Sequence, residues 1–295
     1  MQAAKIFSFA GMSQSEFKVD FMIIGAMKCG TTTVANHLAK HPDVCFCHKK
    51  EAHFFNTVDD WRANLTDYKQ LFENSEGKLV GEGTPAYTAE PFYLPAIHNR
   101  LYAFNPAMKF IYIMRHPVDR MLSHYMHQRA RGFTKLPVEE AIETVPVIKG
   151  VTKYFSQISP YINRFGKENV LLLFFDDLSN KPNEIFETIC GFLKLDCKKL
   201  PDAMERENES AGVAKAHYKV DRLDKSRFLA KVKRFIPAKV RSLLYKTATS
   251  ANASSAIAEK PVLSDTFRKK LLTEFEEEIK GMEMLTGKNL SAWRI

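Results

Sequence analysis

A run of small, basic and hydroxyl-bearing residues near the N-terminus has the composition of an anion-binding turn. It reads Gly25-Ala26-Met27-Lys28-Cys29-Gly30-Thr31-Thr32-Thr33. The two glycines allow a tight turn, Lys28 adds a positive charge, and the threonines add hydroxyl donors. An apolar run precedes the turn and a helical pattern follows it, and the N–H groups at a helix N-terminus favour an anion. We therefore expect a phosphate-binding site, with an ordinary glycine turn capped by threonines as the alternative.

The spacing is close to that of a P-loop, but the lysine is displaced. In the P-loop pattern G-x-x-x-x-G-K-[ST] the lysine follows the second glycine. Here Lys28 precedes Gly30, and Thr31 stands in the lysine position. A second apolar run ends in Arg115, where a nucleoside triphosphatase carries an acidic metal ligand. The pattern favours an anion site that needs no metal, and a P-loop kinase or NTPase is the alternative function.

Arg115 opens a second candidate anion site. It follows the apolar run 109–114 and is expected at the carboxyl edge of the sheet, where open α/β folds bind ligands. Ser123 lies eight residues later, two turns into a predicted helix. Both side chains are therefore expected to reach one anion.

Together the two segments resemble the PAPS-dependent sulfotransferase family, PAPS being 3′-phosphoadenosine 5′-phosphosulfate. The first is similar to the family's 5′-phosphosulfate loop, and Arg115 to Tyr125 is similar to its 3′-phosphate motif, R-x-P-x-x-R-x-x-S-x-Y. Three more segments resemble the branch that holds the heparan-sulfate and related bacterial enzymes. They are KEAHFF at 50–55, GTPAY at 83–87 and the chain ending at 285–293. The resemblance covers about residues 20–295.

The resemblance implies transfer of a sulfuryl group from PAPS, without a metal, to a hydroxyl or amine of a small-molecule, natural-product or carbohydrate acceptor, leaving PAP. The first turn would hold the 5′-phosphosulfate, and Arg115 with Ser123 the 3′-phosphate. A cap loop with further cofactor contacts is matched by 212–217. The cofactor-binding residues implied are Lys28, Cys29, Gly30, Thr31, Thr32, Thr33, Arg115, Ser123, Lys215, Ala216 and His217.

Glu51 is the candidate catalytic base. Sulfuryl transfer needs a base for the acceptor proton and positive charge for the departing phosphate. Glu51 precedes a His-Phe-Phe stretch whose burial is expected to raise its pKa, and the resemblance gives it the same role. Lys28 is expected to stabilise the leaving phosphate, and His53 to orient Glu51 or the acceptor. His48 and His53 are alternative bases, and a solvated surface carboxylate is the alternative reading of Glu51.

A group of histidines and cysteines between 37 and 53 does not have the spacing of a zinc site. Its members are His37, His41, Cys45, Cys47, His48 and His53. Their H-x3-H and C-x-C-H spacings differ from the usual paired zinc motifs, so no metal site is expected.

Three apolar runs, at 21–27, 109–114 and 169–175, predict the buried parallel strands that carry these residues. Helical patterns follow them at 31–39, 118–129 and 183–193, which predicts βα alternation. Further helices are expected at 153–165, with Tyr154 and Gln157 in the acceptor cleft or the core, and from 267 to 279. The expected fold is one α/β, P-loop-like domain at 19–295, with a mostly parallel sheet flanked by helices, after a loose leader at 1–18.

The composition is that of a folded enzyme. The chain has 295 residues and is 45% hydrophobic, which excludes a disordered protein. Five cysteines are an odd number that implies no disulfide framework and favours a reducing compartment. No apolar run reaches the roughly 20 residues of a membrane helix. We expect a cytoplasmic protein whose oligomeric state and acceptor the sequence leaves open.

The net charge of +9 is concentrated in one segment. Residues 225–246 hold eight Lys and Arg and no Asp or Glu, so this segment carries +8 of the total, within a predicted basic helical insertion at about 225–258. It offers few aromatic residues for base stacking, so nucleic acid is not an expected partner. Peripheral contact with an anionic membrane is the better expectation, which co-sedimentation with vesicles tests. A non-catalytic anion- or membrane-binding module is the remaining alternative function.

Overall fold

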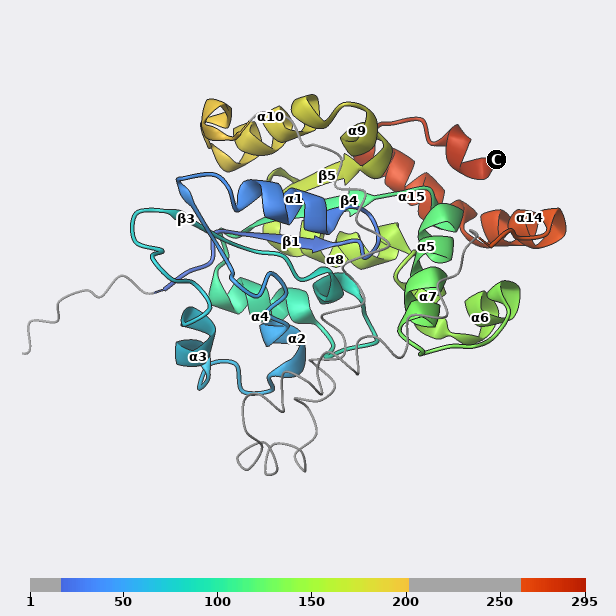
Figure 1. The fold of residues 1–295 in the computed structure, drawn as a ribbon, viewed down its shortest axis with the longest axis horizontal. Helices are drawn as coiled ribbons and strands as arrows, with labels where there is room; N and C mark the ends of the chain where they lie inside the picture. Colours follow the sequence, from blue (N-terminus) through green and yellow to red (C-terminus); the bar gives the residue numbers. More distant parts are fainter. Residues whose placement is uncertain (1–16, 202–260) are drawn as a thin grey trace, which may run out of the picture.

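A computed structural model of the chain describes residues 17–201 and 261–295 (Figure 1). Nearly all of the predicted leader, 1–18, lies outside these residues. The predicted basic insertion at 225–258 and the cap-loop candidates Lys215, Ala216 and His217 also lie outside them.

Five parallel strands form one sheet in the order β2-β3-β1-β4-β5. They are β1 (Phe21–Gly25), β2 (Val44–Phe46), β3 (Leu79–Glu82), β4 (Lys109–Met114) and β5 (Val170–Phe174). The predicted α/β fold with a parallel sheet is confirmed. The three apolar runs are β1, β4 and β5, whereas β2 and β3 were not predicted, because strands of three and four residues are too short to show a period.

Helices cover both faces of the sheet. The helix α1 (Thr31–Leu38) packs on β1 and β2, and α10 (Pro182–Leu193) packs on β5. On the other face α8 (Tyr154–Phe165) packs on β5 and against α4 (Ile97–Phe104), as Figure 1 shows. Because both faces are covered, every side chain of β1 and those of β4 from Phe110 onward are buried.

The predicted helices at 31–39, 118–129, 153–165 and 183–193 are confirmed as α1, α5, α8 and α10. The helix predicted from 267 to 279 is wrong as one element: it is two helices, α14 and α15, which meet at the buried Phe275. The three helices just named without bounds are α5 (Pro117–Ala130), α14 (Asp265–Glu274) and α15 (Glu276–Thr286). The described residues also form the helices α2 (Phe54–Thr57), α3 (Leu65–Lys69), α6 (Val138–Thr144), α7 (Pro146–Gly150) and α9 (Phe175–Asn180). Their 3-10 turns are η1 (Pro85–Thr88), η2 (Lys167–Asn169), η3 (Cys197–Lys199) and η5 (Ser291–Arg294).

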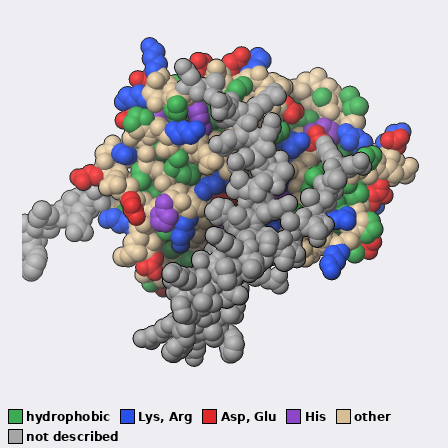
Figure 2. Space-filling view, viewed as in Figure 1, with side chains coloured by type: hydrophobic (Ala, Val, Ile, Leu, Met, Phe, Trp, Pro, Cys, Tyr) green, Lys and Arg blue, Asp and Glu red, His purple; other side chains and the backbone are tan. Residues whose placement is uncertain are grey.

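The described surface carries charges of both signs. On the face shown in Figure 2, Lys and Arg side chains alternate with Asp and Glu side chains. Within residues 17–201 and 261–295, no helix combines the length and the apolar character that crossing a membrane would require.

Two glycines shape the turn after β1 for different reasons. Gly30 has a φ of +87°, a left-handed conformation that glycine adopts without strain. Gly25 is needed for space, because a Cβ there would lie 2.3 Å from the Tyr112 ring and 2.8 Å from the Thr88 hydroxyl. The absence of a side chain at Gly25 lets β4 and η1 approach the start of the turn.

We predict that Gly25→Ala lowers the free energy of unfolding by about 1–3 kcal/mol, because the methyl group overpacks a fully buried site. Chemical denaturation measures the change. Gly191→Ala is the matched control: this exposed position in α10 has open space around it, so alanine should stabilise the helix by about 0.5–1 kcal/mol. Equal effects of the two substitutions would contradict the assignment of Gly25.

Candidate active site

The turn between β1 and α1 leaves backbone donors for an anion. No side chain of the described residues caps the N-terminus of α1, so the N–H groups of its first turn remain for a ligand. Thr32 and Thr33 reach the surface, whereas Thr31 is buried. The Cys29 side chain turns inward, with Sγ 3.8 Å from the Tyr154 hydroxyl, and burial raises the pKa of this thiol to about 11. Cys29 is therefore a neutral core side chain.

Lys28 lies in a strongly positive environment. Burial lowers the pKa of its amine, and repulsion by Arg131, Arg120 and Arg115 lowers it further. Like charges cost free energy when they are held together away from water. An anion bound at this turn would remove that cost.

Arg115 lies directly after β4, at the sheet edge where the sequence predicted it. Its guanidinium lies 4.7 Å above the Phe175 ring and 3.9 Å from the Asp119 carboxylate, one turn along α5. Ser123 lies one turn further along α5 and is half-buried. The Phe175 ring and the Asp119 carboxylate therefore both hold the Arg115 guanidinium in place.

Arg120 binds the backbone of the turn between β1 and α1. Arg120 is part of the 3′-phosphate motif, but this supporting role could not be predicted from the motif. Its buried guanidinium donates to Nδ1 of His124 at 3.2 Å, to the Ile148 carbonyl and to the Met27 carbonyl at 3.5 Å. Burial and the charge of Arg120 lower the pKa of His124 to about 2. A neutral His124 can accept these hydrogen bonds, so Arg120 ties α5 to the residue before Lys28.

Glu51 is held between two neighbours on its own segment. Lys50 Nζ donates to Oε1 at 2.7 Å, and His53 Nε2 lies 3.4 Å from Oε2. Burial raises the pKa of Glu51, but the hydrogen bond from His53 and the charge of Lys50 outweigh it and lower the pKa to about 2. The expected rise was therefore wrong, because apolar neighbours alone do not decide the shift. Glu51 is ionised at neutral pH.

His127 is a second histidine of α5 with a strongly lowered pKa. Burial and then repulsion by Lys28 and Arg131 lower the pKa of His127 to about 3, while Glu51 acts in the opposite sense. Its Nε2 is buried and has no hydrogen-bond partner among the described residues. The imidazole of His127 is therefore uncharged at neutral pH.

Tyr93 lies beside His53, near Glu51. Its ring is 6.2 Å from that of His53 and is 42% exposed, and its pKa is raised by burial and by the charge of Glu51. The sequence analysis named neither His127 nor Tyr93, because neither belongs to a motif that it used.

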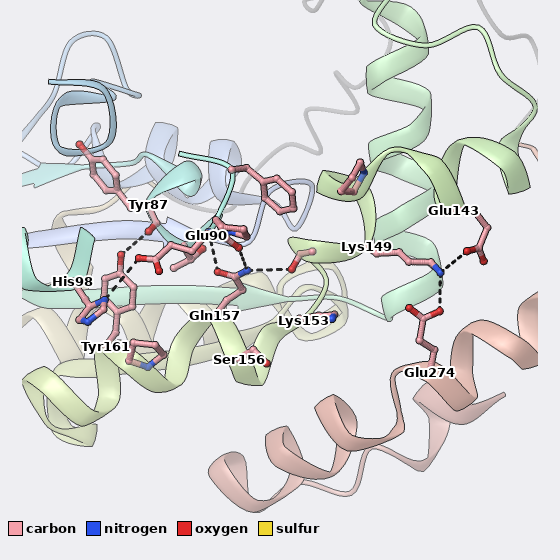
Figure 3. Close-up of a pocket in the computed structure, with 16 residues that line it drawn as sticks. Tyr87, Glu90, His98, Glu143, Lys149, Lys153, Ser156, Gln157, Tyr161 and Glu274 are labelled. Carbon is pink, nitrogen blue, oxygen red and sulfur yellow. Dashed lines mark hydrogen bonds and ion pairs between the residues drawn. The ribbon is translucent and has the colours of Figure 1, made fainter. Parts of the chain in front are cut away.

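A separate cavity of about 760 Å³ lies between α7, α8 and the segment after η1 (Figure 3). Gln157 lines it and binds both the N–H and the carbonyl of Glu90, at 3.2 and 2.8 Å. Lys149 joins Glu143 and Glu274 at its far end. The lining contains none of Lys28, Glu51 and Arg115, so this cavity is not the site of the chemistry.

Tyr154 is a core residue. It is 1% exposed, and its hydroxyl donates to the Arg115 carbonyl at 2.9 Å. Of the two alternatives that the sequence left for Tyr154, acceptor cleft or core, the structure shows the second.

The histidines and cysteines between 37 and 53 have structural partners. The His37 ring packs 4.1 Å from the Phe186 ring, and His41 lies 3.0 Å from the Asp196 carbonyl. In the described part of the chain, no group of three or more His, Cys, Asp or Glu could hold a metal ion.

The fold and the site are those of an α/β domain with a cluster of cations at the edge of a parallel sheet, an arrangement suited to an anionic ligand. Residues 18–238 match the sulfotransferase domain family, and the chain belongs to that family. The family is the one that the sequence motifs resemble, so the chain contains a sulfotransferase domain.

Relatives share parts of the chain. It is 37% identical over 110 residues to the membrane-associated sulfotransferase kil1 of Dictyostelium discoideum, covering 36% of this chain and 22% of that protein. It is 32% identical over 117 residues to human heparan sulfate glucosamine 3-O-sulfotransferase 6, covering 39% and 31%. The chain spans less than a third of either relative.

A solved structure matches nearly the whole chain. The sulfotransferase from Alicyclobacillus acidocaldarius aligns with a TM-score of 0.66 at 24% identity, and the alignment covers 95% of this chain and all of that one. This match shows the fold.

We predict that Arg115→Ala weakens binding of PAP about 10- to 100-fold, the loss expected for one charged hydrogen-bonding partner. Isothermal titration calorimetry at fixed ionic strength measures the Kd. Arg164→Ala is the control, because its guanidinium stacks on Tyr102 on the opposite part of the fold. An unchanged Kd in Arg115→Ala would exclude Arg115 from the cofactor site.

Proposed function

We propose that this enzyme transfers the sulfuryl group of PAPS to a hydroxyl or amine of a small-molecule, natural-product or carbohydrate acceptor by in-line displacement. The observation that carries the proposal is the place of Lys28, Glu51 and Arg115, which follow the parallel strands β1, β2 and β4 and therefore lie along one edge of the sheet. A proton acceptor and an anion site are the two parts that sulfuryl transfer needs.

The cofactor would lie along the carboxyl edge of the sheet. The turn formed by Lys28, Cys29, Gly30, Thr31, Thr32 and Thr33 would hold the 5′-phosphosulfate. The 3′-phosphate would lie between Arg115 and Ser123, which are two turns apart along the start of α5. Lys215, Ala216 and His217 stay predicted contacts from the sequence. Arg120, which the sequence did not assign, supports the turn through the Met27 carbonyl.

The chemistry is a balanced displacement at sulfur. The acceptor oxygen or nitrogen forms a bond to sulfur while the bond from sulfur to the 5′-phosphate oxygen breaks. The acceptor proton passes to Glu51, and PAP leaves with the negative charge that Lys28 stabilises. Glu51 is a weak base, yet it is strong enough, because an acceptor hydroxyl becomes acidic as its bond to sulfur forms. No step requires a metal ion.

Both acceptor types have support among the relatives. One relative is named a heparan sulfate glucosamine 3-O-sulfotransferase, and another, 26% identical over 197 residues, a bifunctional heparan sulfate N-deacetylase/N-sulfotransferase. The first name describes transfer to oxygen and the second transfer to nitrogen. The exposed Tyr93 ring beside His53 would form one wall of the acceptor cleft. A cytoplasmic location and membrane contact through 225–246 stay predictions from the sequence.

We predict that Glu51→Gln lowers kcat about 10²- to 10⁴-fold, the usual contribution of a general base, and leaves the Kd for PAP unchanged. Transfer of radiolabelled sulfate from PAPS to a panel of carbohydrates and of hydroxyl and amine compounds identifies an acceptor for the measurement. Glu76→Gln, an exposed glutamate in the loop before β3, is the matched control and should retain full turnover. Full turnover in Glu51→Gln would refute the role of Glu51 as base.

We predict that Lys50→Met moves the acid limb of the kcat/KM profile upward by about 1–3 pH units, because loss of the ammonium raises the pKa of Glu51. The ionised form is the active one, so the variant should lose activity as the pH falls through the raised pKa, while the wild type stays ionised down to about pH 2. Profiles from about pH 3 to about pH 8 test this, with the neighbouring Lys49→Met as the control. Coincident acid limbs in wild type and Lys50→Met would contradict it.

A further inference from the structure

The segment that carries Glu51 follows β2, and it is hydrogen-bonded at several residues to the segment at the end of the neighbouring strand β3. These are the base segment, residues 50–55, and the supporting segment, residues 82–87. The Ala52 N–H donates to the Glu82 carboxylate, the His53 N–H to Thr84 Oγ1 at 3.4 Å, and the Phe55 N–H to the Tyr87 hydroxyl at 3.4 Å. In return, Gly83 N–H donates to the Lys50 carbonyl at 3.0 Å. The two segments are therefore fixed against each other on both sides of Glu51.

Glu82 is the centre of this contact. It ends β3 and is 0% exposed. Tyr68 donates its hydroxyl to Oε2 and Thr84 donates its hydroxyl to Oε1. The Tyr87 hydroxyl and the Ala52 N–H also act to lower the pKa of Glu82. A carboxylate has four acceptor sites and no proton to give, so it has the capacity for all of these neighbours. Burial raises the pKa of Glu82, while the hydrogen bonds from Thr84, Tyr68 and Tyr87 act to lower it.

The base segment has a backbone that needs such a support. Lys50 and His53 have φ values of +55° and +53°, left-handed conformations for residues that carry a Cβ. Each costs about 1–3 kcal/mol and persists only where the surroundings hold it. These two residues are also the partners that bind the Glu51 carboxylate. The orientation of the Glu51 carboxylate therefore depends on a strained turn.

We propose that Glu82 is a positioning residue, a buried carboxylate that holds the turn between Glu51 and His53 in the conformation in which Glu51 meets the acceptor. Thr84 connects Glu82 to this turn, because its hydroxyl donates to Glu82 and accepts the His53 N–H. The inference rests on the proposed function, because it assumes that Glu51 is the base. Nothing in the sequence patterns used above marked Glu82, which precedes the G-T-P-A-Y segment by one residue.

The test is Glu82→Gln, which keeps the shape of the side chain but replaces one acceptor oxygen by an NH2 group that faces a donor. We expect kcat to fall about 10- to 100-fold, the effect of losing a charged hydrogen bond. The Kd for PAP should stay unchanged, because the hydrogen bonds that join Tyr68, Glu82, Thr84 and Tyr87 to the base segment involve neither Arg115 nor a residue of the phosphate turn. The acid limb of the kcat/KM profile should move upward, because a displaced His53 no longer lowers the pKa of Glu51.

Thr84→Val carries the same test if Glu82→Gln does not purify as a folded protein. It removes the acceptor of the His53 N–H and keeps the volume of this buried side chain. Thr134→Val is its matched control, because Thr134 is also buried and its hydroxyl also accepts a backbone N–H, that of Leu136 at 3.2 Å. Only Thr84→Val should lower kcat and move the acid limb, at comparable thermal stability.

The outcomes separate this proposal from the proposed function. If Glu51→Gln loses turnover while Glu82→Gln and Thr84→Val lose stability alone, with unchanged kcat and pH profile, the role of Glu82 is overturned. A parallel loss of PAP binding in either variant also overturns it, because that result indicates general damage to the fold. If Glu51→Gln keeps full turnover, the role of Glu51 as base fails, and the role of Glu82 fails with it. If the wild-type protein neither binds PAP nor transfers sulfate from PAPS, the proposed function itself fails.

Discussion

The crowding of positive charge at the carboxyl edge of the sheet is the constraint on which the site depends. Lys28 follows β1 and Arg115 follows β4, and these two strands are paired in parallel, so the fold itself brings both cations to one edge. Arg120 and Arg131 add to the repulsion that lowers the pKa of Lys28. Packing of the strands and helices holds these groups together, and a bound anion would relieve their repulsion. Part of the free energy of that binding would then come from repulsion already present in the free protein.

Two fully buried ionisable side chains then position the backbone on either side of the reaction. Arg120 holds the Met27 carbonyl next to Lys28, and Glu82 accepts the Ala52 N–H next to Glu51. The hydrogen bonds of both go to neutral groups: His124 and two carbonyls for Arg120, hydroxyls and an N–H for Glu82. Removing one partner from such a group is costly, because a buried ionisable group is left incompletely solvated. This makes both groups effective supports for the loops that they contact.

Strong local patterns explain which features could be predicted from the sequence. The turn at 25–33 and the place of Arg115 follow from apolar runs that end in a recognisable polar residue, and both were predicted. The sign of the Glu51 pKa shift could not be, because it depends on a left-handed turn that brings His53 back to the carboxylate. The burial of Glu82 depends on β3, which is only four residues long, and on Tyr68, fourteen residues earlier. Such long-range partners leave no periodic signal.

The pairing of Glu51 also defines how an acceptor can approach its carboxylate. Lys50 donates to Oε1 and His53 lies at Oε2, which leaves each oxygen with a further acceptor site. An acceptor can therefore hydrogen-bond to either oxygen, and it gains more room where the existing partner is the weaker one. The contact with His53, at 3.4 Å, is longer than the contact with Lys50, at 2.7 Å, and is therefore the easier one to exchange. We expect the acceptor proton to pass to Oε2, while Lys50 keeps the carboxylate in place.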